Sequence, residues 1–217
     1  MQEIQMEKKA IIFGDSYSTF AGEVPAGYAV YYTPTDEKCS GVTDVSETWW
    51  HIVMREAGLK LIQNNSWSGS SIGYTGYGGY DASRDSSFIY RLRKLTEGGF
   101  FEANEVDVVF IFGGTNDSWS NAPLGEEKHS EWEERDLYSV LCAVPYYLKS
   151  VRDTIPSAEI YCLINTEIKD EIASCLKSSC DRYGITPITF NKIDKVNGHP
   201  TKQGMLDIAN TVINAIK

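Results

Sequence analysis

The chain has 217 residues, 42% of them hydrophobic and 23% charged, and 30 acidic residues against 20 basic ones give a formal net charge of −10. This composition excludes disorder as the main state, and the lack of a long apolar run in the sequence excludes a membrane-spanning segment. The negative charge repels phosphate backbones and anionic lipid headgroups, so neither nucleic acid nor a membrane is an expected partner. The length predicts a single domain over residues 1–217.

Cysteine usage and the N-terminal residues bear on the cell compartment. The five cysteines are an odd number without zinc-type spacing, so we expect them to be reduced. Residues 1–9 are polar and lack the apolar segment of a secretory signal, which predicts a flexible N-terminus and a cytoplasmic protein. A chain whose signal had been removed would look the same. The sequence has no metal-ligand cluster, Walker-type loop or nicotinamide fingerprint, so no metal or cofactor is expected.

Short apolar runs alternate with helix-like segments along the chain. The expected strands are 10–13, 59–63, 106–112, 159–165 and 184–189. The expected helices are 47–57, 85–96, 131–153 with a new turn or kink at Pro145, 169–182 and 202–216. Residues 64–69 have a turn composition, and residues 73–80 alternate Gly and Tyr, as in an exposed loop. The alternation indicates repeated βαβ units and predicts an α/β fold of about five parallel strands covered on both faces.

Small hydrogen-bonding residues follow three of the predicted strands. They form the blocks Gly14-Asp15-Ser16, Asn65 to Gly69 and Gly114-Thr115-Asn116-Asp117. In parallel sheets ligands bind beyond the carboxyl ends of the strands, so these loops are the expected site. His199 precedes the last predicted helix in a loop that also follows a strand, and we expect it at the same rim.

These three blocks and a fourth, His199-Pro200, resemble in order and spacing those of the SGNH, or GDSL-type, hydrolases. The resemblance implies a three-layer αβα, flavodoxin-like fold and esterase or lipase activity. It also implies that Ser16 is the nucleophile and His199 its base. The implied oxyanion hole consists of the backbone N–H groups of Ser16 and Gly69 and the side-chain amide of Asn116. Acyl transfer needs such groups, because a serine hydroxyl is weak without a base and the tetrahedral oxyanion requires fixed donors.

The sequence departs from the family pattern at the third member of the triad. The family usually carries Asp three residues before the histidine, and Val196 stands there. Because valine cannot accept the imidazole N–H, the nearest carboxylate, Asp194, is the candidate. Asn197 or a backbone carbonyl is the alternative acceptor, which would stabilise the imidazolium less.

Four further residues lie in or beside these blocks. Asp15 and Asp117 are expected to brace their loops by accepting backbone N–H bonds, and Asp15 is also a candidate substrate contact. Trp67 and Trp119 flank the oxyanion blocks and offer flat faces on which a sugar ring or an acyl group would stack. Ordinary loop packing is the alternative for both.

The residues together predict a metal-independent serine esterase that acts through an acyl-enzyme. The expected substrate is a small acyl ester, such as an acetyl ester, of a carbohydrate or other polar alcohol. The alternatives are a lipase or acyl-thioesterase of the same family, a binding module that keeps the scaffold without turnover, and a flavodoxin-like domain that holds a phosphate or cofactor. The oligomeric state stays open.

Overall fold

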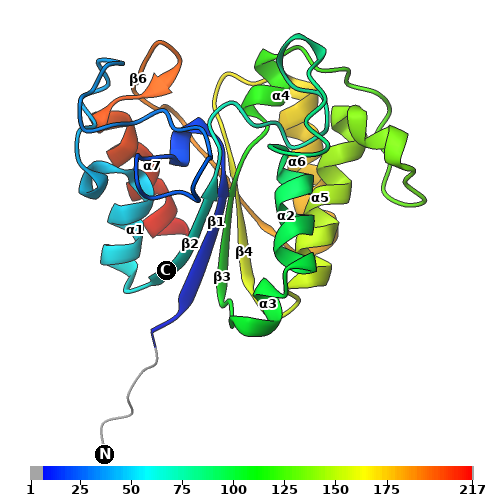
Figure 1. The fold of residues 1–217 in the computed structure, drawn as a ribbon, viewed down its shortest axis with the longest axis horizontal. Coiled ribbons are helices and arrows are strands. Elements are labelled where there is room, and N and C mark those ends of the chain that lie inside the picture. Colours follow the sequence, from blue (N-terminus) through cyan, green and yellow to red (C-terminus); the bar gives the residue numbers. More distant parts are fainter. Residues whose placement is uncertain (1–6, 217) are drawn as a thin grey trace, which may run out of the picture.

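A computed structural model describes residues 7–216, and its centre is a sheet of five parallel strands in the order β2-β1-β3-β4-β5 (Figure 1). The strands are β1 (Lys9–Gly14), β2 (Lys60–Ser66), β3 (Val108–Phe112), β4 (Glu159–Ile164) and β5 (Thr186–Thr189). This is the flavodoxin-like order, in which the chain changes direction between β1 and β3. The predicted α/β fold is therefore confirmed. Residues 1–6 of the polar N-terminal stretch lie outside the described residues.

Helices cover both faces of this sheet (Figure 1). On one face lie α1 (Trp49–Ala57) and α7 (Lys202–Ala215), and on the other lie α2 (Phe88–Glu97), α5 (Val140–Thr154) and α6 (Asp170–Tyr183). The short helices α3 (Phe100–Ala103) and α4 (Thr115–Trp119) follow α2 and β3. None of the helices among residues 7–216 is both long and apolar enough to cross a membrane.

The strands alternate their side chains between two hydrophobic clusters. Ile11 and Phe13 of β1 join the cluster under α2, α5 and α6, while Ala10 and Ile12 join the cluster under α1 and α7. All five residues of β3 are buried. Burial on both faces explains why β1, β3 and β4 contain continuous apolar runs in the sequence.

Several element boundaries differ from the prediction. The expected helix over 131–153 is instead a 3-10 turn at Glu134–Tyr138 followed by α5. Pro145 lies inside α5, and it cannot bond the carbonyl of Leu141 four residues earlier. The backbone N–H of Lys128 donates to that carbonyl over 3.4 Å. A tertiary hydrogen bond thus replaces the one that proline removes.

The region expected as turn and exposed loop is more ordered than its composition suggests. β2 continues through Asn64 and Asn65, which pair with β1, because the buried amide of Asn64 donates to the carbonyl of Ser18 over 2.8 Å. Within residues 73–80, Tyr74 is fully buried, and exposure begins at Tyr77. Tertiary partners therefore decide the structure of these polar residues.

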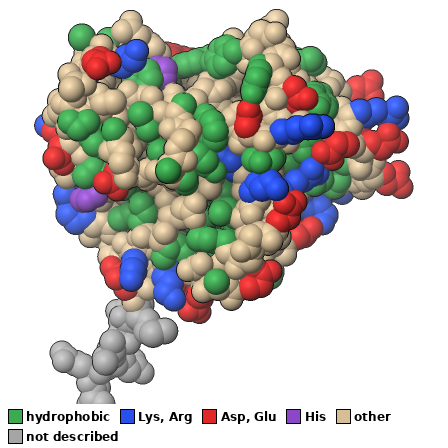
Figure 2. Space-filling view, viewed as in Figure 1, with side chains coloured by type: hydrophobic (Ala, Val, Ile, Leu, Met, Phe, Trp, Pro, Cys, Tyr) green, Lys and Arg blue, Asp and Glu red, His purple; other side chains and the backbone are tan. Residues whose placement is uncertain are grey.

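Charged side chains gather on the side of the molecule that carries α2 and α5 (Figure 2). Arg93 and Glu134 form an ion pair of 2.8 Å there, and Lys128 pairs with Asp136 over 2.6 Å. The Lys128–Asp136 pair is half-buried, whereas Glu134 is exposed, and exposed ion pairs contribute little to stability. Most acidic residues of segment 126–136 are solvent-exposed: Glu126, Glu127, Glu131, Glu133 and Glu134.

Candidate active site

Ser16 begins a 3-10 turn directly after β1, next to the point where the chain changes direction between β1 and β3. Asp15 caps this turn, since its Oδ1 accepts the backbone N–H of Tyr17 over 3.0 Å. Gly14 allows the close packing of the turn, because a Cβ at this position would lie 2.5 Å from Oγ of Ser66. Ser16 itself is only 2% exposed.

His199 lies on a small hairpin that precedes α7. Strands β6 (Lys195–Val196) and β7 (His199–Pro200) are joined by Asn197 and Gly198, whose φ angles are 49° and 77°. Two positive φ values are typical of the type I′ turn that an Asn-Gly pair favours. The hydroxyl of Tyr17 donates to the carbonyl of Gly198 over 2.5 Å, which ties the hairpin to the Ser16 turn.

The hairpin brings His199 to Ser16 across 183 positions of sequence. Nε2 of His199 lies 2.9 Å from Oγ of Ser16, and Nδ1 lies 3.1 Å from the carbonyl oxygen of Asn197. Because a carbonyl only accepts, the hydrogen of the neutral ring sits on Nδ1, and Nε2 accepts from the serine hydroxyl. This tautomer is the one a general base needs.

Burial lowers the pKa of His199, and the positive charges of Lys195 and Lys38 act in the same direction. The hydrogen bond to Asn197 acts against them. The ring is therefore neutral at neutral pH and able to accept a proton.

Asp194 does not reach the imidazole, so the prediction of this residue as the third triad member is wrong. Its Oδ2 accepts the hydroxyl of Thr201, and its carbonyl accepts the backbone N–H of Thr201 over 3.0 Å. These bonds fasten the start of α7. The backbone-carbonyl alternative is the arrangement observed, because the tight Asn-Gly turn folds the carbonyl of Asn197 back toward the ring.

Three aromatic rings surround His199. Tyr31 stacks on it with 3.6 Å between centroids and 7° between planes. Trp119 presents an edge at 5.7 Å, and Tyr17 lies at 5.5 Å. The stacking by Tyr31 was not predicted, because nothing in a single sequence links residues so far apart.

The three predicted oxyanion donors lie at the ends of β1, β2 and β3. Gly69 has a φ of 83°, a conformation that favours glycine. Within residues 7–216, the backbone N–H groups of Ser16 and Gly69 have no hydrogen-bond acceptor. The side-chain nitrogen of Asn116 donates to the carbonyl of Ser70 over 2.9 Å, and its Oδ1 accepts the hydroxyl of Tyr77 over 3.0 Å.

Arg91 on α2 links the ends of β1 and β2 and the loop after β2 through hydrogen bonds. It is fully buried and donates to the carbonyl of Gly14 over 3.2 Å, to Oδ1 of Asn65 over 2.9 Å and to Oγ of Ser70 over 3.0 Å. The burial of Arg91 could have been predicted, because Arg91 lies three positions after Phe88, on the apolar face of the predicted helix.

The carboxylates beside the site act on the backbone. Asp117 accepts the backbone N–H groups of Ile72 and Gly73 over 2.9 and 3.2 Å, so it braces the β2 loop. Asp15 has no exposed surface, which rules out the substrate contact considered above. Burial raises the pKa of Asp15 to about 7 and that of Asp117 to about 6.

The two tryptophans occupy different surroundings. Trp119 is 37% exposed and packs beside His199, where a Cβ on Gly198 would approach its ring to 2.9 Å. Trp67 packs on Tyr28 with 4.3 Å between ring centroids. Both therefore take part in loop packing, and Trp119 also keeps an exposed surface next to His199.

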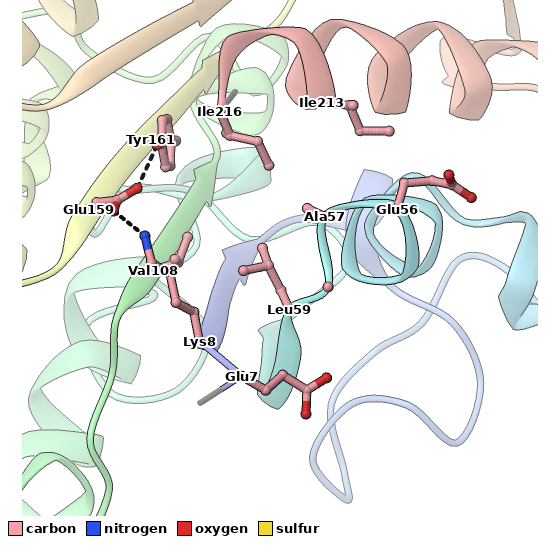
Figure 3. Close-up of a pocket in the computed structure, with 11 residues that line it drawn as sticks. Glu7, Lys8, Glu56, Ala57, Leu59, Val108, Glu159, Tyr161, Ile213 and Ile216 are labelled. Atoms are coloured by element: carbon pink, nitrogen blue, oxygen red, sulfur yellow. Dashed lines mark hydrogen bonds and ion pairs between the residues drawn. The ribbon is translucent and has the colours of Figure 1, made fainter. Parts of the chain in front are cut away.

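A separate hollow of about 690 Å³ lies at the amino ends of the strands, at the opposite end of the sheet from Ser16 (Figure 3). An ion pair between Lys8 and Glu159 crosses its wall, and Tyr161 donates to the same carboxylate. None of the residues that line it is a serine, cysteine or histidine. It therefore lacks a Ser–His pair like the one at the carboxyl ends of the strands.

Comparison with known proteins decides the family. The model of the GDSL-like lipase/acylhydrolase family matches residues 8–216. The chain belongs to this family. Membership supports an ester hydrolase and confirms the resemblance predicted from the four blocks.

Solved structures of similar proteins agree with this assignment. A GDSL-like lipase from Bacteroides ovatus is 38% identical, with 98% of this chain and 99% of that chain covered and a TM-score of 0.90. A second from Bacteroides uniformis is 41% identical, with 98% and 96% covered and a TM-score of 0.90. A family two carbohydrate esterase from Clostridium thermocellum is 20% identical, with 97% and 63% covered and a TM-score of 0.66, and shares the fold. No curated protein matches the chain.

Proposed function

We propose that this GDSL-family hydrolase is a metal-independent serine esterase that removes a short acyl group, such as acetyl, from an oxygen of a carbohydrate or other polar alcohol. The observation that carries the proposal is the 2.9 Å contact between Oγ of Ser16 and Nε2 of His199. A neutral imidazole in this tautomer is able to take the hydroxyl proton as the oxygen attacks an ester carbonyl.

The reaction proceeds in two steps. Ser16 attacks the ester carbonyl while His199 takes its proton, and the resulting oxyanion accepts hydrogen bonds from Ser16 N–H, Gly69 N–H and the Asn116 amide. His199 then returns the proton to the departing alcohol, leaving an acyl-enzyme. Water, deprotonated by the same imidazole, releases the acid and restores the serine.

The surroundings of the site favour a polar alcohol and a short acyl chain. Tyr31 and Trp119 beside His199 offer the aromatic surfaces on which sugar rings stack, and the alcohol leaves on the side of the base. Ser16 is 2% exposed, so only a small part of it is open to an incoming ester, which favours a short acyl group. The fold shared with the Clostridium thermocellum carbohydrate esterase is compatible with a sugar substrate.

A second candidate is a binding module without turnover. It is favoured by the carbonyl partner of His199, which carries no charge to stabilise an imidazolium. One structure with the same fold, at 18% identity, is of a carbohydrate esterase whose active site displays divergent catalytic and non-catalytic binding functions.

The test is hydrolysis of p-nitrophenyl acetate, longer p-nitrophenyl esters and acetylated sugars by the purified chain. We expect short esters and acetylated sugars to be cleaved, and Ser16→Ala and His199→Asn to lose at least about 10³-fold in kcat. His129→Asn is the matched control, since His129 bonds to Glu127 and Tyr183 away from the site. Sugar binding without hydrolysis by the wild type would favour the binding module.

A further inference from the structure

The amide of Asn116 is held at both of its ends by groups of the chain. Its nitrogen donates to the carbonyl of Ser70 over 2.9 Å, and its oxygen accepts from the hydroxyl of Tyr77 over 3.0 Å. A carbonyl cannot donate, so the end that faces Ser70 is the nitrogen. The end that faces Tyr77 is then the oxygen, and the phenol is the donor.

These two bonds leave one N–H of the amide for a ligand. The amide has two hydrogens, Ser70 takes one, and no other acceptor among residues 7–216 takes the second. The phenol remains protonated at neutral pH, because burial and the nearby carboxylates of Asp15 and Asp117 raise the pKa of Tyr77. It therefore stays a donor under the conditions of the reaction.

We propose that Tyr77 is a positioning residue of the oxyanion hole, which orients and polarises the Asn116 amide through its hydroxyl; this rests on the proposed function. Rotation of the amide about its last side-chain bond would break both bonds at once. A donor on Oδ1 also draws electron density from the amide nitrogen, which makes the remaining N–H a stronger donor.

The loop that carries Tyr77 is built for this contact rather than for core packing. Tyr77 is 48% exposed, on a turn that contains Gly78 and Gly79 with φ angles of 65° and 78°. The base of the turn is fixed by the backbone N–H of Gly76, which donates to the carbonyl of Tyr80 over 2.8 Å. Because about half of Tyr77 is exposed, removing its hydroxyl mainly removes the hydrogen bond to Asn116.

The chain supplies a matched control in the same loop. Tyr80 is 55% exposed, and its hydroxyl donates to the exposed carboxylate of Asp85 instead of to the site. Tyr77→Phe and Tyr80→Phe each remove one phenol oxygen and keep the ring. Only the first of them removes a bond to Asn116.

The experiment is a double-mutant cycle on p-nitrophenyl acetate hydrolysis with Tyr77→Phe, Asn116→Ala and the double variant, beside Tyr80→Phe. We expect Tyr77→Phe to lower kcat and kcat/KM equally, by about threefold to tenfold, because an oxyanion contact acts in the transition state. Asn116→Ala should cost about 10²-fold or more, and adding Tyr77→Phe to it should cost nothing further. Tyr80→Phe should match the wild type.

The other outcomes distinguish a failure of the proposed role of Tyr77 from a failure of the proposed esterase function. Wild-type kcat in Tyr77→Phe, or a loss that persists in full in the Asn116→Ala background, overturns the role of Tyr77 while the esterase assignment stands. An equal loss in Tyr80→Phe assigns the effect to the loop as a whole and also overturns it. A wild type that neither hydrolyses any ester nor reacts at Ser16 with a fluorophosphonate refutes the proposed function, and the role of Tyr77 falls with it.

Discussion

The Nδ1–H group of His199 donates a hydrogen bond to the uncharged carbonyl of Asn197, over 3.1 Å. A carbonyl fixes the tautomer of the ring but provides no negative charge against the imidazolium that forms during attack. The face of Tyr31 lies parallel to the ring at 3.6 Å. An aromatic face both holds the imidazole in plane and attracts its positive form.

Tyr31→Leu should therefore lower kcat by about threefold to tenfold, since an aromatic contact of this kind contributes about 0.5–1.5 kcal/mol. Tyr31→Phe keeps the ring and should stay within about twofold of the wild type. Steady-state kinetics on one short ester measure both variants. Equal losses in the two would assign the effect to the phenol oxygen and contradict the stacking role.

The pH dependence of kcat/KM reports the protonation of His199. Only the neutral ring acts as a base, and burial sets its pKa below the ordinary value of 6.5. Activity should therefore persist as the pH falls to 6.5 and decline only through a pKa below that value. A profile on an uncharged acetyl ester tests this, and an acid limb centred above 6.5, or none, would disagree.

At the scale of elements, the β6–β7 hairpin positions His199, the proposed base. Its turn residue Gly198 has a φ of 77°, and a Cβ there would come within 2.9 Å of the Trp119 ring. Any side chain at this position must therefore move the hairpin, the tryptophan or both. His199 follows directly and would move with it.

Gly198→Ala should lower kcat at least tenfold, while Gly184→Ala should leave it unchanged. Gly184 ends α6 with a φ of 63° and has open space where a Cβ would be. Both substitutions cost about 1–2 kcal/mol of stability through the left-handed backbone. Urea unfolding and ester kinetics on the two variants separate the effects, and an equal loss of activity in both would refute the steric account.

Local patterns predicted the main elements, but not the elements that complete the site. The apolar run before Gly14 and the small residues after it were sufficient to locate the Ser16 turn. The hairpin has strands of only two residues, too short for periodicity, although its Asn197-Gly198 pair is a strong turn signal. The contacts of Tyr31 and Tyr77 depend on packing between residues far apart in the chain, and such contacts cannot be inferred from a single sequence.

Across the whole molecule, buried carboxyl groups link stability to pH. Burial raises the pKa of Asp15 from 3.8 to about 7. Between these values the folded chain holds a proton on Asp15 that the unfolded chain has lost. The stabilisation that the protonated Asp15 provides is therefore complete below pH 4 and is lost as the pH rises through about 7. The slope approaches about 1.4 kcal/mol per pH unit.

Asp15→Asn should remove this contribution and keep the cap on the Ser16 turn. The free energy of unfolding, measured in urea between pH 5 and pH 8, should fall less with rising pH in the variant than in the wild type. Identical pH dependence in the two proteins would show that Asp15 is charged in the folded state throughout this range.

The proposed reaction requires Ser16 to be a nucleophile that His199 activates. The most direct test of this requirement is mass spectrometry of the chain after treatment with a fluorophosphonate, with peptide mapping of the adduct. We predict one adduct per chain, on Ser16, and none on Ser16→Ala. No adduct on the wild type, or an adduct that persists unchanged in Ser16→Ala, would contradict the proposed reaction.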